Sequence, residues 1–161
     1  MAAKTQAIPK GYTAVTPYLT IKNANDALTF YKKAFGAQEI GRLNMPDGAI
    51  GHAEIEIGGA KIMISEENRE RGNLSPQSLG GSPIALCLYV EDVDSVFSKA
   101  LNEGAKVVKD MEVKDQYWGD RGGTLTDPFG FNWSIMTHIE DVSMDEMQKR
   151  TNEMFAQVKT S

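Results

Sequence analysis

The residues best placed to do chemistry form a short alternating run, His52, Glu54 and Glu56, within a predicted strand. Alternate residues of a strand point to the same face, so His52 and Glu54 could both reach one ion. A divalent metal needs several nitrogen, oxygen or sulfur donors that converge at about 2 Å. The simpler interpretation is the polar face of an amphipathic strand, which lines a cavity or is exposed to water. We favour that interpretation from the sequence.

A second group, Trp118, Asp120 and Arg121, lies at the start of another predicted strand. Asp120 and Arg121 could form an ion pair that orders the loop, or Arg121 could offer its guanidinium to an anionic ligand. Of the two, we prefer the structural ion pair. Trp118 could supply an aromatic wall to a ligand cavity.

Two further residues with reactive side chains receive structural interpretations. Cys87 is the only cysteine and lies in the apolar run IALCLYV, so we expect a small buried side chain rather than a nucleophile. His138 ends a predicted strand, where a surface histidine is expected more often than a metal ligand. The sequence has no G-x-S-x-G, P-loop or G-x-G-x-x-G motif, so serine hydrolase, NTPase and Rossmann functions have no support.

Composition sets broad limits on partners and location. The chain has 161 residues and a formal net charge of −5, without the clustered Lys and Arg of a nucleic-acid surface. It has no apolar run of membrane-spanning length, and its first residues lack the apolar core of a secretory signal. A single cysteine excludes an intrachain disulfide, and we expect a cytoplasmic location with neither membrane nor nucleic-acid partners. The acidic balance is compatible with a cationic ligand.

The predicted elements occur twice in the same order. Helices are predicted at 23–35, with Asn23 or Asn25 as N-cap, and at 92–103; Gly36 and Gly104 end them. Strands are predicted at 13–21, 37–44, 49–57, 60–65, 84–90, 105–113, 117–126 and 131–138.

An internal repeat supports this order. YLTIKNANDALTFYKKAFGA, from Tyr18, matches CLYVEDVDSVFSKALNEGA, from Cys87, and GGAKIMIS matches FGFNWSIM. A βαβββ unit therefore occurs twice, which predicts an α+β fold. The predicted organisation is a flexible arm at 1–11, a first module at 12–66, a linker at 67–82, a second module at 83–138 and a C-terminal helix within 139–161.

The C-terminal helix begins with Ser143-Met144-Asp145-Glu146, which has the pattern of a capping box. It should run to about residue 158, with Met144, Met147, Met154 and Phe155 available for packing. We expect the helix to pack on its own domain; the alternative is a helix that braces a dimer.

Several motifs together resemble the vicinal oxygen chelate superfamily, and more narrowly its PhnB-like branch. They are TPYL from Thr16, ALxFYxxAFG from Ala27, GHAEI from Gly51, WGDR from Trp118, DPFG from Asp127, WSI from Trp133 and THxEDV from Thr137. The superfamily includes glyoxalase I, extradiol dioxygenases, and the fosfomycin and bleomycin resistance proteins. The resemblance implies a cupped eight-stranded mixed sheet around a cavity, usually formed within a homodimer.

The resemblance also implies four metal-ligand positions, which fall on Thr16, Met63, Ala85 and Ser134. None is a His, Asp, Glu or Cys, so we expect no metal of the superfamily's usual kind and no other cofactor. An inward Ser134 places Asn132 on the cavity side and Trp133 in the core, because strand residues alternate.

The sequence thus favours a glyoxalase-like, bleomycin resistance-like protein that binds a small or cationic ligand as a homodimer, with sequestration as the mechanism. The predicted ligand-binding residues are Thr16, His52, Glu54, Met63, Trp118, Asp120, Arg121 and Ser134. The alternative is a metal-dependent lyase, isomerase or dioxygenase with a rearranged site at His52 and Glu54. The sequence names neither a ligand nor a catalytic residue.

Overall fold

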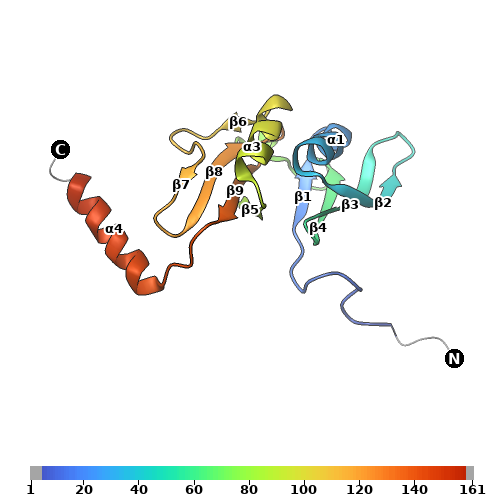
Figure 1. Cartoon of the computed structure of the whole chain (residues 1–161). Helices are drawn as coiled ribbons and strands as arrows, with labels where there is room; N and C mark the ends of the chain where they lie inside the picture. The colour runs from blue at the N-terminus through green and yellow to red at the C-terminus, as the bar shows by residue number, and fades with distance from the viewer. Residues whose placement is uncertain (1–4, 159–161) are drawn as a thin grey trace.

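The computed structural model describes the backbone of residues 5–158 and places their side chains as far as Ala156. The ends of the predicted arm and C-terminal segment, residues 1–4 and 159–161, lie outside the described residues. The predicted α+β fold is confirmed: two sheets of four and five strands each carry a helix, and a further helix follows at the C-terminus (Figure 1). None of the helices in residues 5–158 is long and apolar enough to cross a bilayer.

The two βαβββ modules repeat one topology. In the first sheet the order is β1-β4-β3-β2, with β1 parallel to β4 and the other pairs antiparallel. In the second it is β5-β9-β8-β6, with β7 also paired to β8. The first module comprises β1 Tyr18–Ile21, α1 Ala24–Phe35, β2 Gln38–Asn44, β3 Ile50–Ile57 and β4 Ala60–Glu66. The second comprises β5 Ala85–Tyr89, α3 Val93–Asn102, β6 Lys106–Val107, β7 Lys114–Asp115, β8 Asp120–Thr126 and β9 Asn132–His138.

The expected eight-stranded sheet is divided, because β1 and β5 each end a separate sheet. The modules meet instead through α1 and α3, which lie side by side in Figure 1. Tyr31 of α1 donates a hydrogen bond to Asp127 Oδ2 at 2.8 Å, and Trp133 Nε1 donates to the same oxygen at 3.0 Å. Burial raises the pKa of Asp127, although four hydrogen bonds to its carboxylate oppose that rise. This buried cluster joins the modules away from the open sides of the sheets.

Two predicted strands are much shorter than expected. The first begins only at Tyr18, because Pro17 has no N–H to donate, although its carbonyl accepts from Met63 N at 2.9 Å. The strand predicted at 105–113 is reduced to β6. Val108 N and Met111 O still bond to Thr124, and Asp110 between them adopts a φ of 62°. A bulge of this kind turns the chain over the sheet.

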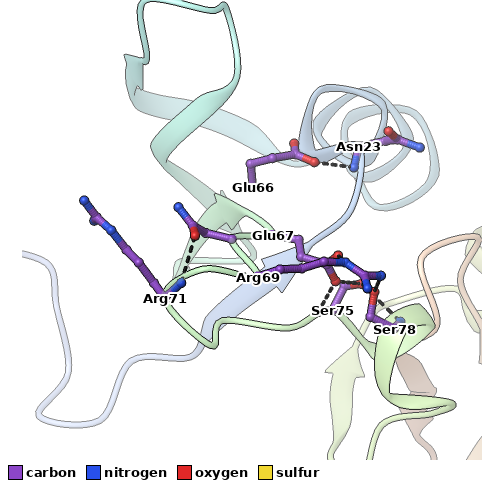
Figure 2. Close-up of polar contacts among 8 residues, drawn as sticks. Asn23, Glu66, Glu67, Arg69, Arg71, Ser75 and Ser78 are labelled. Atoms are coloured by element: carbon purple, nitrogen blue, oxygen red, sulfur yellow. Dashed lines mark hydrogen bonds and ion pairs between the residues drawn. The ribbon is translucent and has the colours of Figure 1, made fainter.

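Two adjacent carboxylates at the end of β4 hold the first helix and the predicted linker (Figure 2). The expected side-chain N-cap is wrong: Asn23 makes no cap hydrogen bond, and Glu66 accepts from Asn23 N at 2.8 Å and Ala24 N at 2.9 Å. Glu67 accepts from the amide of Ser75 at 2.7 Å and from its hydroxyl at 2.6 Å. These hydrogen bonds therefore hold the linker in place. The linker also includes a short helix, α2 Pro76–Leu79.

The C-terminal helix, α4 Met144–Val158, does not pack on its own domain as expected, but extends away from the sheets (Figure 1). Its start is held by Arg150, which pairs with Glu140 at 2.7 Å and donates to the carbonyl of Tyr117 at 3.2 Å. Beyond that anchor Met154 and Phe155 are exposed, as is Met144. Half of the predicted capping box forms: Ser143 Oγ accepts from Glu146 N. The Glu146 carboxylate pairs with Arg150 instead.

Candidate functional site

Each sheet has one side packed against the helices and one open side, here named the first face and the second face. On the first face, Tyr18, Met63, Glu54 and Gly41 lie opposite one another across the four strands. The equivalent row on the second face is Cys87, Ser134 and Thr124. The repeat seen in the sequence therefore places Met63 and Ser134, two predicted site residues, at matching positions of the two faces.

The first face carries a chain of hydrogen bonds that ends at an exposed tyrosine. Tyr12, from the arm, donates its hydroxyl proton to Glu54 Oε2, and His52 Nε2 lies 3.2 Å from Glu54 Oε1. His52 Nδ1 lies 3.2 Å from the hydroxyl of Tyr18 on β1. The hydrogen bond from Tyr12, followed by that from His52, lowers the pKa of Glu54, and the same contact raises the pKa of Tyr12 to about 12.

A positive charge and a further carboxylate border this chain. Lys61 Nζ lies 4.5 Å from the ring centroid of Tyr12, which is a cation–π distance. Glu56 is opposite Lys61 in the ladder and shares the face of His52 and Glu54, as predicted. The first face is thus a charged, partly solvated surface with a connected set of hydrogen bonds.

The second face has a cavity of about 250 Å³. Trp118, Thr124, Ser134 and Met136 line it, and Met111 lies on the segment that crosses β8. Thr124 and Ser134 share a hydrogen bond at 3.1 Å. Asp110, Lys114 and Gln116 also border the cavity, so its lining combines apolar side chains and hydroxyls with a charge of each sign. Such a lining suits a small, partly aromatic ligand held by a few polar contacts.

A buried carboxylate beside this cavity fixes the position of Trp118. Asp120 is 4% exposed and accepts hydrogen bonds from Trp118 Nε1 at 3.0 Å and Tyr89 Oη at 2.9 Å. Its other oxygen lies 2.8 Å from His138 Nδ1, while Asp141 lies 3.0 Å from His138 Nε2. Burial favours the neutral acid, but the bonds from His138, Tyr89 and Trp118 outweigh it and lower the pKa of Asp120. The two carboxylates raise the pKa of the exposed His138.

The predicted ion pair between Asp120 and Arg121 does not form. Neighbouring strand residues point to opposite sides, so Asp120 faces the cavity side and Arg121 faces away. Arg121 donates to both carboxylate oxygens of Asp94 at 2.8 Å and to Asp115 at 3.0 Å. Of the predicted ligand-binding residues, Arg121 is the one that the structure turns away from the open faces.

Cys87 is exposed, contrary to the expectation of a buried side chain. Its apolar surroundings in the sequence suggested burial, but β5 lies at a sheet edge, and its residues Ala85, Cys87 and Tyr89 are exposed on the open side. Cys87 borders a second cavity of about 280 Å³ between the arm, the start of β4 and this edge. Val15, Lys61 and Leu86 are among its lining residues.

The four positions implied for a metal do not fit one. Thr16 donates its hydroxyl proton to the carbonyl of Thr13 at 3.3 Å, and Ser134 is bonded to Thr124. Met63 and Ala85 supply no donor that a hard divalent metal prefers. Within residues 5–158, no three His, Cys, Asp or Glu side chains are grouped closely enough to hold an ion, so His52 and Glu54 have no third carboxylate, thiolate or imidazole beside them.

Several residues of both faces escaped the sequence analysis. Tyr12 and Tyr18 reach His52 and Glu54 only through long-range pairing, which single-sequence patterns do not reveal. A signal did exist on β8, where Gly122 and Gly123 adjoin within one strand. A Cβ on Gly122 would lie 2.6 Å from Met136 Cγ, and one on Gly123 would lie 2.8 Å from Met111 O. Paired glycines in a strand mark such close approaches, and here they bring the cavity walls together.

Comparison with known proteins agrees with this geometry. The model of the Glyoxalase/Bleomycin resistance protein/Dioxygenase superfamily matches residues 12–135. An uncharacterized protein of Mycobacterium tuberculosis is 44% identical over 138 residues, which is 84% of this chain and 80% of that protein. The crystal structure of an Arabidopsis thaliana gene product is 28% identical, with a TM-score of 0.61 over 77% of this chain and 98% of its own. A PhnB protein from Bacillus cereus, 18% identical, shares the fold with a TM-score of 0.61 over 78% of this chain and 99% of its own.

The chain therefore belongs to the glyoxalase/bleomycin resistance/dioxygenase superfamily, the vicinal oxygen chelate superfamily that its motifs resemble. Family membership fixes the fold and leaves the ligand open, because this fold hosts unrelated functions.

Proposed function

We propose that the protein is a homodimeric, cytoplasmic binder of a small molecule that needs no metal of the superfamily's usual kind. The single observation that carries the proposal is the cavity on the second face, with the Trp118 indole held against it by Asp120. A rigid aromatic wall with a few hydroxyls binds a small, mostly apolar molecule and orients it through a small number of polar contacts.

Donor chemistry supports binding without a metal. The cavity of the second face is lined by Ser134, Thr124 and Met136, and Asp110 is the one carboxylate that the described residues contribute to its lining. Hydroxyls, a thioether and a single carboxylate cannot replace the several imidazole and carboxylate ligands of a divalent ion. The carboxylates of the first face, together with the net charge of −5, favour a neutral or cationic ligand over an anionic one.

The free sheet edges support a homodimer. The β5 edge is short and carries exposed Ile84 and Tyr89, and Tyr18 and Val15 are exposed at the β1 edge. An unpaired apolar edge pairs readily with another chain. Apposition of β1 from one copy to β5 from the other would join a four-stranded and a five-stranded sheet into one continuous sheet and bring a first face and a second face around one cup. The alternative, in which the two edges stay free, is a monomer in solution.

The proposal is tested by calorimetric binding of small aromatic amines and neutral aromatics to EDTA-treated protein. Ser134→Phe fills the cavity and should abolish binding, whereas Arg121→Gln, on the adjoining strand but the opposite side, should leave it unchanged. Sedimentation velocity on the same samples should give the mass of two chains. Binding that Ser134→Phe does not affect would contradict the proposed cavity.

Metal analysis of protein purified without added metal tests the remaining alternative. Near-stoichiometric metal that disappears in His52→Ala would support a metal-dependent enzyme at His52 and Glu54 and would overturn metal-free binding. Binding to EDTA-treated protein that Zn²⁺ or Mn²⁺ does not strengthen supports the proposal.

A further inference from the structure

The hydrogen-bonded chain on the first face has an arrangement of protons that satisfies every partner with His52 protonated at Nε2 alone. The Glu54 carboxylate is held in its ionised form by its partners, so it only accepts hydrogen bonds. Tyr12 and His52 Nε2 must therefore donate to it. In the tautomer that carries its proton on Nε2 alone, Nδ1 accepts and the Tyr18 hydroxyl donates to it. The lone pairs of the Tyr18 oxygen are then left for another partner.

This arrangement has the order of a catalytic triad, with a hydroxyl, an imidazole that can take its proton, and a carboxylate that orients the imidazole. Tyr18 is 55% exposed, while His52 and Glu54 are 33% and 27% exposed at their side chains. The outermost member, Tyr18, is therefore the most open to a ligand. Tyr12 adds a second hydrogen bond that holds Glu54 in place, and Met63, between Tyr18 and Glu54 in the ladder, provides an apolar contact.

We propose that Tyr18, His52 and Glu54 form a metal-free acid–base relay that takes a proton from a molecule bound over the first face. The proposal rests on the proposed function only in that a ligand must reach this face. Its substrate class is a neutral organic molecule with an acidic C–H, beside a carbonyl or in an electron-poor ring. Tyr18 is the catalytic residue, and His52, Glu54 and Tyr12 act through it.

The proton step balances without any further reactant. The substrate C–H proton moves to the Tyr18 oxygen while the Tyr18 hydroxyl proton moves to His52 Nδ1, and the C–H electron pair stays on the substrate. The imidazolium so formed is stabilised through its Nε2–H by ionised Glu54. The proton returns by the same route to the product, or to water, which restores the neutral imidazole.

Nitrobenzisoxazole is a suitable probe, since it is neutral, planar and carries one acidic C–H. Removal of that proton breaks the ring N–O bond and gives a nitrile and a coloured phenolate. We expect wild-type protein treated with EDTA to accelerate this reaction, and Tyr18→Phe and His52→Gln each to lower kcat about 100-fold. Tyr12→Phe should cause a smaller loss. Tyr117→Phe, a tyrosine remote from the relay, is the matched control and should keep full activity.

A second readout separates a relay from a merely structural cluster. NMR of the imidazole nitrogens should show His52 protonated at Nε2, and Glu54→Gln should alter that signal and kcat with little change in KM. The relay is overturned if wild-type protein gives no more than the buffer rate, or if Tyr18→Phe retains the wild-type kcat. Retained binding of aromatic molecules in that case would leave the proposed binding function intact, so the two failures are distinguishable.

Discussion

The two open faces occupy equivalent positions in a repeated module, yet they differ in chemistry. The first face places Tyr18, His52 and Glu54 in a partly solvated chain of hydrogen bonds. The second face buries one carboxylate, Asp120, beside a cavity lined mostly by neutral side chains. The repeated module supplies the same scaffold twice. A few residues in equivalent rows of the two sheets determine the chemistry of each face.

This difference shows which polar groups stabilise the fold and which remain available to a ligand. Asp120 accepts three hydrogen bonds within its own module. Its carboxylate therefore serves to position Trp118, Tyr89 and His138. The chain on the first face ends at a tyrosine oxygen that still has a lone pair to offer. The second face is therefore suited to shape a ligand, and the first to exchange a proton with it.

The largest expected difference lies between the carboxylates of the two faces. Asp120→Ala leaves three donors without their acceptor in a buried place and should lower the free energy of unfolding by about 2–4 kcal/mol. Glu54→Ala removes a partly solvated acceptor and should cost less than about 1 kcal/mol. Urea denaturation of both variants measures this. Equal losses would contradict the distinction between a structural and an available carboxylate.

Two glycines give the next contrast. A Cβ on Gly122 would lie 2.7 Å from the backbone oxygen of Ile135, so Gly122→Ala should destabilise the protein by about 1–3 kcal/mol through overpacking. On the first face, a Cβ on Gly41 would lie 3.9 Å from Glu54 Oε2, which is ordinary contact. In thermal melts, the Tm of Gly122→Ala should therefore lie clearly below that of Gly41→Ala. A Gly122→Ala variant that keeps the wild-type Tm would show that the cavity wall is not closely packed.

A smaller effect should appear as a pH dependence that differs between the two faces. Asp120 and Asp141 raise the folded pKa of His138, so its contribution is fully present below the unfolded value of about 6.5. That contribution is lost as pH rises through the folded pKa. The difference in Tm between wild type and His138→Gln should thus be greatest near pH 6 and shrink toward pH 9. Glu54 has a lowered folded pKa, so the Glu54→Gln difference should shrink only on acidification below about pH 4.

Much of the fold could be predicted, because local rules act within each module. Gly36 ends α1 with a φ of 67°, and Gly130 in the Asp-Pro-Phe-Gly turn has a φ of 93°. The alternation on β9 was also predicted, and Trp133 is in the core while Ser134 borders the cavity. These features depend on periods of two residues and on the conformational freedom of glycine.

Two of the errors share a cause, which is dependence on distant pairing. Cys87 was expected to be buried, since an apolar run does not reveal that its strand lies at a sheet edge. Glu66, forty-three residues from Asn23, caps the helix that Asn23 was expected to cap. The aspartate–arginine pair was misjudged for a different reason, since alternation along β8 could have separated Asp120 from Arg121.

The most direct test of metal-free binding at the second face is an NMR titration of EDTA-treated protein with small aromatic compounds. The account predicts that a binding compound shifts the indole N–H of Trp118 and the amides of Gly122 and Gly123, and that added Zn²⁺ or Mn²⁺ leaves its affinity unchanged. If the resonances of these three residues shift only after a metal is added, metal-free binding at the second face is contradicted.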